Sequence, residues 1–368
     1  MTQQQPFYFR FTMVLLMLAL LCLFIYVGAD LVVPFALAML IAILLIPICN
    51  WLQRKGLGRA VSTMIALLAA ALLVGGILYF LSSQIASFLN DFDQIKKGIN
   101  THVQTVQTWI RQRFGLSLRE QDDLVNKAVA SMKSSGQGAM GSAFSSLTSV
   151  VTTTVLLPIY VFLLLYYRSL IRQFFIEVFS KTPPDEVAAI INESRTVVQS
   201  YMVGLLIEFV IVSAINAAGF LILGIKYAIF LAVFAAVLNI LPYIGMLIAS
   251  IFCMLVTLTT SDKLSEPIWV LVVLLVVQFI DNNIIMPKIV GSKVKLNALV
   301  TIAGVVVGGL LCGVSGMFLS IPVIAILKII FDRIEDLRPW GKLFGDEEDS
   351  AKHSKARAKN VSRKKKEE

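Results

Sequence analysis

Histidine is almost missing from this sequence, since only His102 and His353 occur among its 368 residues. A metal centre built on several histidines is therefore excluded. The four cysteines lie in or beside apolar runs without metal-ligand spacing, so we expect them to be buried packing residues. They are Cys22, Cys49, Cys253 and Cys312. A phosphate-binding loop is also absent, which argues against ATP-driven pumping by this chain alone. We expect no cofactor.

Charged residues are scarce too, at 15%, whereas hydrophobic residues reach 57% and the mean hydropathy is +0.82. These values lie outside the soluble globular range. Several apolar runs approach or exceed the roughly 18–20 residues that span a bilayer. The short alternating segments of membrane β-strands are lacking. The composition therefore predicts an all-α, polytopic helical membrane protein in contact with membrane lipid.

The net charge of +9 comes from basic residues between the apolar runs and in the C-terminal tail. The aromatic platforms of a nucleic-acid-binding face do not accompany them, so we expect no nucleic acid as partner. One enzyme motif occurs, because residues 313–316 have the GxSG form of intramembrane serine proteases. Such a serine needs a base beside it, and neither histidine lies in an apolar run. We therefore expect no enzyme.

The apolar runs divide the chain into four regions. Residues 1–81 hold three spans, of which the first two predict a helical hairpin with Asp30 at its tip. Residues 82–143 have amphipathic helical spacing and predict an extramembrane helical region. Residues 144–335 form the membrane core, and residues 336–368 predict a charged, disordered tail.

Two apolar segments, 229–260 and 300–331, are too long for one upright span. Each has 32 residues and would reach about 48 Å as a single helix, against roughly 30 Å of hydrocarbon. The first is interrupted by Pro242 and Gly245, and the second by a group of glycines around Gly309. Each is either one tilted span or a pair of short helices that returns to its starting side.

Three lysines between these segments distinguish a tilted span from a hairpin: Lys288, Lys293 and Lys295. If both segments return as hairpins, these lysines and the basic tail lie on the cytoplasmic side, as the positive-inside rule requires. We therefore predict two Pro/Gly-broken helical hairpins, with both chain ends cytoplasmic in the plasma (inner) membrane. An opposed pair of broken helices is typical of transporters with inverted repeats.

A polar patch ends the apolar run at residues 268–288. Gln278, Asp281 and Asn282 are spaced i, i+3, i+4 and share one helix face. An aspartate facing lipid costs about 2.5–3.5 kcal/mol, so this face should meet protein or a water-filled cavity. Helix packing at the membrane interface is the alternative. Glu208 is a second acid within a span, for which an interfacial ion pair is an equal alternative.

Broken helix at membrane depth is tolerated where it lines a cavity or is buried in protein, so both hairpin tips should approach Asp281. The predicted ion or solute path comprises Asp281, Gln278, Asn282, Asn239, Pro242, Tyr243, Gly245, Glu208, Gly309, Gly313 and Ser315.

A family resemblance rests on LPYIG at 241–245, QFIDNNIIMPKIVG at 278–291 and the glycine-rich last segment. Together these resemble the autoinducer-2 exporter family, or PerM-like permeases, over about residues 10–335. The resemblance implies multi-pass proteins that move small solutes outward, with a signalling furanone as the named substrate. For some members it implies sodium or lithium/proton exchange, and it implies pentameric assembly. The chain departs from relatives at Asn297-Ala298, where they often carry His-Pro.

These features predict a secondary transporter, a proton- or sodium-coupled exporter of a small solute such as a signalling furanone. Asp281, helped by Gln278 and Asn282, would bind the coupling proton or cation, and the tips at Pro242 and Gly313 would gate access. A cation/proton antiporter and a passive channel are the alternatives.

Overall fold

The computed structural model describes residues 6–90, 155–242, 244–261, 263, 265–289 and 296–345. The predicted extramembrane region falls mostly outside these residues, as does the predicted tail from residue 346 onward. The helix that begins at Arg59 continues past residue 82 to Asn90, and the regional boundary placed at that residue stays a prediction.

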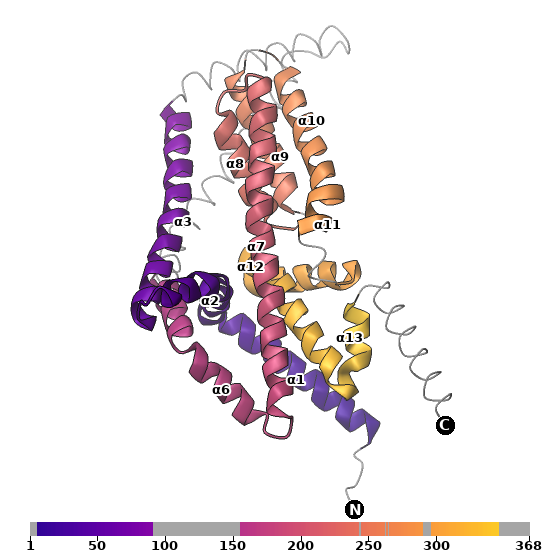
Figure 1. Cartoon of the computed structure of the whole chain (residues 1–368). Coiled ribbons are helices and arrows are strands. Elements are labelled where there is room, and N and C mark those ends of the chain that lie inside the picture. Colours follow the sequence, from indigo (N-terminus) through magenta and orange to yellow (C-terminus); the bar gives the residue numbers. More distant parts are fainter. Residues whose placement is uncertain are drawn as a thin grey trace, which may run out of the picture. The chain divides into compact units, whose positions relative to one another are not determined.

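The described residues form helices and no strand (Figure 1). The helices are α1 (Phe7–Val27), α2 (Ala29–Arg54), α3 (Arg59–Asn90), an unlabelled helix at Val155–Tyr166, α6 (Arg168–Val178), α7 (Pro184–Ile222), α8 (Ala228–Asn239), α9 (Ile244–Thr260), α10 (Ser265–Ile280), the π-helical turn η1 (Asp281–Ile285), α11 (Met286–Ile289), α12 (Ala298–Arg333), the 3-10 turn η2 (Glu335–Leu337) and α13 (Arg338–Phe344).

Among the described residues, five helices are long and apolar enough to cross a membrane by length and composition: α2, α3, α7, the continuous helix from α10 through α11, and α12, which is counted here over both sides of its kink. A sixth span is added if Val155–Tyr166 and α6 count together, although the two are bent by 68°. This count confirms the prediction of a polytopic helical membrane protein, because runs of this length and hydropathy are what a bilayer requires.

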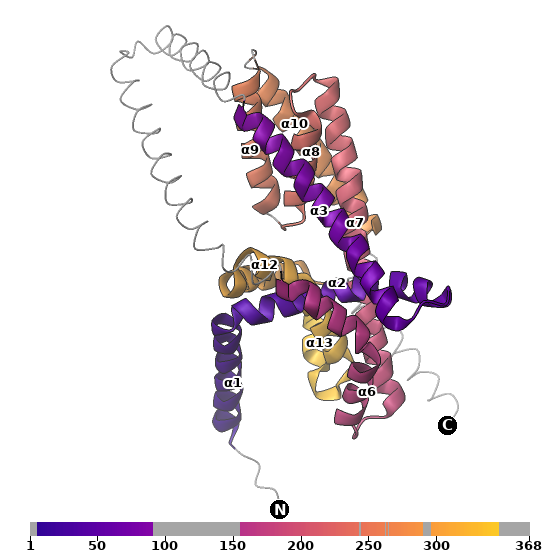
Figure 2. The same ribbon diagram turned by 90° about the vertical axis from the view of Figure 1, so that its left-hand side faces the viewer.

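The predicted hairpin at Asp30 is wrong. The chain passes from α1 to α2 through Gly28 alone, and its carbonyl already accepts the first α2 hydrogen bond from Val32. Every side chain from Phe11 to Val27 is exposed except Ile25, so α1 does not pack back along α2. Figure 2 shows the two helices meeting at a bend. The sequence signal was two adjacent apolar runs, which does not distinguish a bend from a hairpin.

The cysteines are all free and differ in burial. Cys49 and Cys253 are buried, as expected, whereas Cys312 is half-buried and Cys22 is exposed on α1. The expectation of burial is therefore wrong for Cys22 within this chain, because its helix has no neighbour along most of its length.

The chain folds as two compact units. The first unit draws on Met1–Leu67, Leu156–Leu205 and Pro287–Glu368, and the second on Leu68–Val155 and Leu206–Met286. The core of the second unit packs Phe220 of α7 against Phe230 and Leu231 of α8, Cys253 of α9 and Val270 of α10. The second unit thus has an apolar core of its own.

In the second unit, the segment broken at Pro242 is a hairpin. Cys253 Sγ lies 3.8 Å from the Leu231 carbonyl oxygen, although the two residues are 22 positions apart and would be about 33 Å apart in one straight helix. The rings of Phe234 and Phe252 lie 4.3 Å apart across the same two arms. Helices α8 and α9 therefore run antiparallel, with α10 beside them (Figures 1 and 2). The hairpin alternative is confirmed here.

In the first unit, α12 folds back at Cys312 and Gly313. Ser320 Oγ donates to the Gly304 carbonyl at 2.8 Å, although the residues are 16 apart and would be about 24 Å apart in a straight helix. Gly313 makes the reversal with φ +60°, which a residue with a Cβ rarely adopts. The arms then touch so closely that a Cβ on Gly316 would clash with the Gly308 carbonyl. The second predicted hairpin is also confirmed.

Candidate functional site

Two acidic side chains meet one amide in the second unit. Asn239 Nδ2 donates to Asp281 Oδ2 at 2.9 Å and to Glu208 Oε1 at 3.3 Å. The three residues come from three different helices, and the two hydrogen bonds span 42 and 31 positions of sequence. We refer to Glu208 and Asp281 as the carboxylate pair. Both are deeply buried, with exposed fractions of 6% and 2%.

Each helix places its residue for a local reason. Glu208 lies on the buried stripe of α7 with Leu205, Val212 and Asn216, which recur at helical spacing. Asn239 is the last residue of α8, so its side chain stands at the hairpin tip rather than along an arm. The carboxylate pair is therefore joined at the point where the first hairpin reverses.

Asp281 opens the π-helical turn η1, and the Met286 amide bonds back to the Asp281 carbonyl. Pro287 follows directly, and a proline within a helix has no amide hydrogen to donate and crowds the carbonyl of the preceding turn. The π turn, which is wider than an α-helical turn, contains the residues that Pro287 would crowd. Such turns occur mostly as single insertions within α-helices, frequently at functional sites.

The polar patch of α10 and η1 divides between two environments. Asp281 continues the buried stripe of Leu274 and Val277, whereas Asn282 is exposed. Gln278 is half-buried and its Nε2 donates to Asn282 Oδ1 at 3.0 Å. Asn239, and not Gln278 or Asn282, is the hydrogen-bond donor that the structure places on Asp281. A supporting role of those two amides in ion binding stays a prediction.

Each member of the carboxylate pair keeps one buried oxygen without a hydrogen-bond partner among the described residues. These atoms are Glu208 Oε2 and Asp281 Oδ1. No lysine or arginine of the described segments lies within ion-pair distance of either side chain. Two buried negative charges beside one amide are costly, because desolvation and mutual repulsion act together. A proton or cation on the pair removes this cost.

The chemistry of the cluster limits what it can bind. Within the described ranges, no group of three or more His, Cys, Asp or Glu side chains is placed to hold a metal ion. The pair supplies oxygen atoms only, from its two carboxylates, and the amide of Asn239 presents its nitrogen to them. Oxygen ligands suit hard cations, and two carboxylates also suit a shared proton. The arrangement fits a proton or a monovalent cation.

The hairpin tip beside Asn239 holds two further predicted residues. Pro242 lies in the turn between α8 and α9, and Gly245 in the first turn of α9 is buried against the Leu238 carbonyl. A Cβ at Gly245 would clash with that carbonyl, so glycine is required for the tip to close. Tyr243 lies outside the described residues.

The other predicted residues belong to the first unit. Gly313 is the reversal point of α12, Gly309 packs against Met317 of the opposite arm, and Ser315 is half-buried beside the tip. The approach of this tip to Asp281 stays a prediction.

Asn216, in the same helix as Glu208, is a buried polar residue that was not among the predicted site residues. It is 2% exposed, and its Oδ1 has no hydrogen-bond partner among the described residues, as is also true of Thr257 Oγ1. Asn216 lies eight positions after Glu208, about 12 Å along the same stripe. That spacing was the signal available in the sequence, because a buried amide in a span needs a partner or water.

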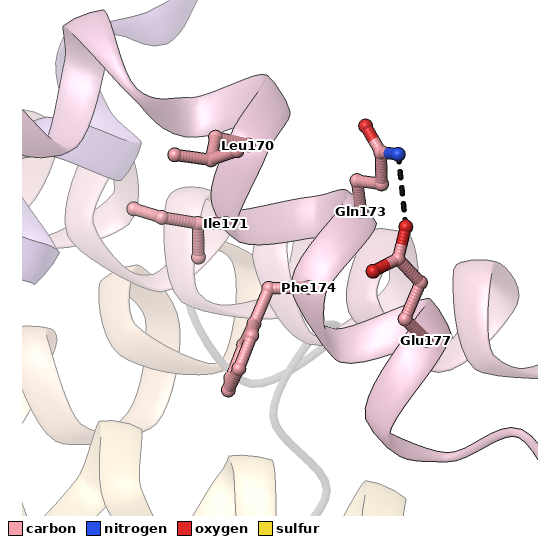
Figure 3. A pocket seen from close by; sticks show the side chains of 5 residues that line it. All are labelled: Leu170, Ile171, Gln173, Phe174 and Glu177. Atoms are coloured by element: carbon pink, nitrogen blue, oxygen red, sulfur yellow. Dashed lines mark hydrogen bonds between the residues drawn. The ribbon is translucent and has the colours of Figure 1, made fainter.

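A hollow on the surface of α6 is chemically different from the carboxylate pair. Leu170, Ile171 and Phe174 line it together with Gln173, which donates to Glu177 Oε1 at 2.9 Å (Figure 3). All of its lining comes from one helix and is mostly apolar. Such a lining is typical of a helix face that meets lipid rather than a polar solute.

Long apolar helices, helical hairpins and a buried acidic pair together define a multi-pass membrane transport protein. Comparison with known proteins gives the family. The model of the AI-2E family transporters matches residues 15–336, and the chain belongs to this family. The resemblance inferred from the sequence motifs is thereby confirmed.

Several relatives carry names that refer to transport. The AI-2 transport protein TqsA of Escherichia coli is 26% identical over 323 residues, covering 86% of this chain and 90% of TqsA. YrrI of Bacillus subtilis, also named as a transport protein, is 24% identical over 304 residues, covering 81% of this chain and 85% of YrrI. A Haemophilus influenzae relative named for transport is 27% identical over 332 residues, covering 88% and 92%.

Proposed function

We propose that this protein is a secondary transporter in which the carboxylate pair binds the coupling proton or monovalent cation. The observation that carries the proposal is the double hydrogen bond of Asn239 to Glu208 and Asp281. It joins an ion-binding group to a hairpin tip, which is the part of a broken helix best able to move. Charge and backbone conformation are therefore coupled through a single amide.

This coupling arises because the Asn239 amide binds an ionised carboxylate more strongly than a protonated one. Asn239 Nδ2 donates hydrogen bonds, and a carboxylate accepts them more strongly than a protonated carboxyl does. A proton or cation on the pair weakens the hold on Asn239 and frees the hairpin tip. Loss of that proton or cation restores the hold. An imposed ion gradient thus drives the tip between two positions.

The proposed cargo is a small solute moved outward, such as a signalling furanone, which is what the family resemblance implies; the relative TqsA is named for AI-2 transport. Cation/proton antiport is the second candidate, because a pair of acids that takes either ion completes that exchange by itself. The proposed setting is the inner membrane, with both chain ends in the cytoplasm. A homo-oligomer, a pentamer by family resemblance, is part of the same proposal.

The test uses the full chain in proteoliposomes with imposed proton or sodium gradients. The flux of a furanone and the internal pH are followed for the wild type, Asp281→Asn and Glu208→Gln. We expect folded variants with gradient-driven flux reduced by about tenfold or more, since each loses one of two ionisable ligands. Glu266→Gln is the matched control, because it removes an acid from α10 near its start.

Three results would contradict the proposal in different ways. Wild-type flux in Asp281→Asn would exclude the carboxylate pair from coupling. Furanone flux that ignores both gradients in the wild type would favour a channel. Sodium/proton exchange without any furanone flux would favour the antiporter.

A further inference from the structure

Three arginines from three helices gather in the first unit. Arg59 begins α3, Arg168 begins α6 and Arg195 lies in the first half of α7. The positive charges of Arg59 and Arg195 both act on Arg168, so both lie within electrostatic range of its guanidinium group. Arg59 Nη1 donates to Ser169 Oγ at 3.0 Å and to the Tyr166 carbonyl at 3.3 Å.

No carboxylate neutralises this cluster within the described residues, whose ion pairs are Lys328–Asp332 and Arg333–Glu193. Arg168 and Arg195 are nonetheless half-buried. Like charges that are partly withdrawn from water are unfavourable unless an anion joins them. An anion is therefore the group that this arrangement favours.

A neutral donor points to the same conclusion. Gln53 Oε1 accepts from Arg168 Nη2 at 3.0 Å, which fixes the orientation of its amide. Gln53 Nε2 is then a buried donor without a hydrogen-bond partner among the described residues. An anion beside Arg168 would accept from this nitrogen as well as from the guanidinium groups.

Aromatic residues place the cluster at the level of the membrane surface. The Lys55 ammonium lies 3.8 Å from the ring centroid of Trp51, one turn earlier in α2. The Trp51 side chain is 55% exposed. Tyr166 and Tyr167 are exposed immediately before Arg168. Exposed tryptophan and tyrosine between an apolar span and basic residues are typical of the headgroup region.

Helix α6 has the form of a helix that lies along this surface. It follows a 68° bend after the apolar helix Val155–Tyr166. Leu170, Phe174 and Val178 are exposed on one face, whereas Arg168 and Arg172 belong to the polar side. An exposed apolar face beside basic residues is the pattern of interfacial helices.

We propose that Arg59, Arg168 and Arg195 hold the phosphate of an anionic membrane lipid where α2 ends and α3 begins. The guanidinium groups bind the phosphate oxygens, and Gln53 Nε2 donates a further hydrogen bond. The lipid chains lie along the apolar face of α6. The occupant is a lipid rather than free phosphate, because the aromatic residues and the exposed face of α6 adjoin the arginines.

The full-length protein in detergent tests this by native mass spectrometry and thermal melting with added phosphatidylglycerol, phosphatidylcholine or inorganic phosphate. We expect preferential retention of phosphatidylglycerol and a raised Tm. The Arg168→Gln/Arg195→Gln variant should retain it about tenfold more weakly, since two charge-assisted contacts are lost. Arg168→Lys should fall between, because it keeps the charge without the planar fork.

Arg338→Gln is the matched control, because it removes the same charge from an exposed site on α13 and should leave retention unchanged. Equal retention by the double variant and the wild type would overturn the proposal, as would equal retention of the two lipids. A Tm rise with phosphate alone that matches phosphatidylglycerol would overturn the lipid assignment. Elution volume in size-exclusion chromatography verifies that each variant is folded.

Discussion

Both hairpins reverse within a broken apolar helix, but different interactions stabilise their tips. The α8–α9 hairpin ends at Asn239, whose side chain binds two buried acids. The α12 hairpin reverses at Gly313, and its arms are held by backbone contact and by Ser320. One tip therefore carries charge-sensitive chemistry, whereas the other depends on close packing. A broken helix at membrane depth can satisfy its polar groups in either way.

This contrast predicts the largest effect at Asn239. Asn239→Leu removes the donor that the described residues supply to both acids, so coupled flux should fall as far as in Asp281→Asn. The free energy of unfolding should fall by about 1–3 kcal/mol, because buried acceptors lose their partner. Flux assays and thermal melting measure the two effects. Gln278→Leu is the control, because Gln278 is half-buried one turn before Asp281 and does not donate to either acid. An equal loss of flux and stability in that variant would contradict the special role of Asn239.

Close packing is tested next by Gly245→Ala and Gly316→Ala. In each case the added Cβ would clash with a carbonyl of the opposite arm, namely that of Leu238 or Gly308. Both variants should lose about 1–3 kcal/mol of stability in thermal or denaturant unfolding. Gly75→Ala is the control, since no atom lies within 4 Å of its Cβ position. It should be stabilising by about 0.5–1 kcal/mol; equal losses at all three positions would refute the packing argument.

Gly313→Ala separates backbone conformation from packing. Nothing lies within 4 Å of a Cβ at this position, yet its φ is +60°. The expected loss of stability is about 1–3 kcal/mol, because positive φ combined with ψ −146° is a backbone conformation essentially confined to glycine. An unchanged Tm would mean that the reversal relaxes to another conformation.

Ser320→Ala should have the smallest effect. Its hydroxyl contacts the Gly304 carbonyl across the hairpin at 2.8 Å and the Gly316 carbonyl in its own arm at 2.7 Å. Loss of this hydroxyl should cost about 0.5–1.5 kcal/mol in unfolding experiments and leave coupled flux unchanged. A flux defect as severe as that of Asn239→Leu would show that both tips carry the coupling chemistry.

Local sequence signals predicted much of the fold. Hydropathy predicted the spans, and the prolines and glycines predicted both broken segments. These signals are readable from the sequence because hydropathy and backbone restriction act over short stretches of chain. The positive-inside rule favoured hairpins over tilted spans, and the contacts across Pro242 and Gly313 bear this out. The α1–α2 hairpin was wrong, since a polar residue between apolar runs does not determine the angle at Gly28.

The sequence identified the acidic residues of the candidate site but not the residues that contact them. Asp281 and Glu208 were singled out because an acid within a span is costly. The i, i+3, i+4 spacing grouped Asn282 with Asp281, whereas the structure buries only Asp281. Adjacent helix positions differ by about 100° in direction, and the neighbouring helices decide which of them is covered.

The amino-acid sequence by itself determined the class of protein, the broken spans and the presence of two costly acids, because hydropathy and backbone restriction are properties of local chain. Only the tertiary structure decided that Asn239 joins Glu208 to Asp281, and that Arg168 meets Gln53 while the charges of Arg59 and Arg195 act on it. These groups come from separate helices, and packing between helices is what brings such residues within hydrogen-bond distance.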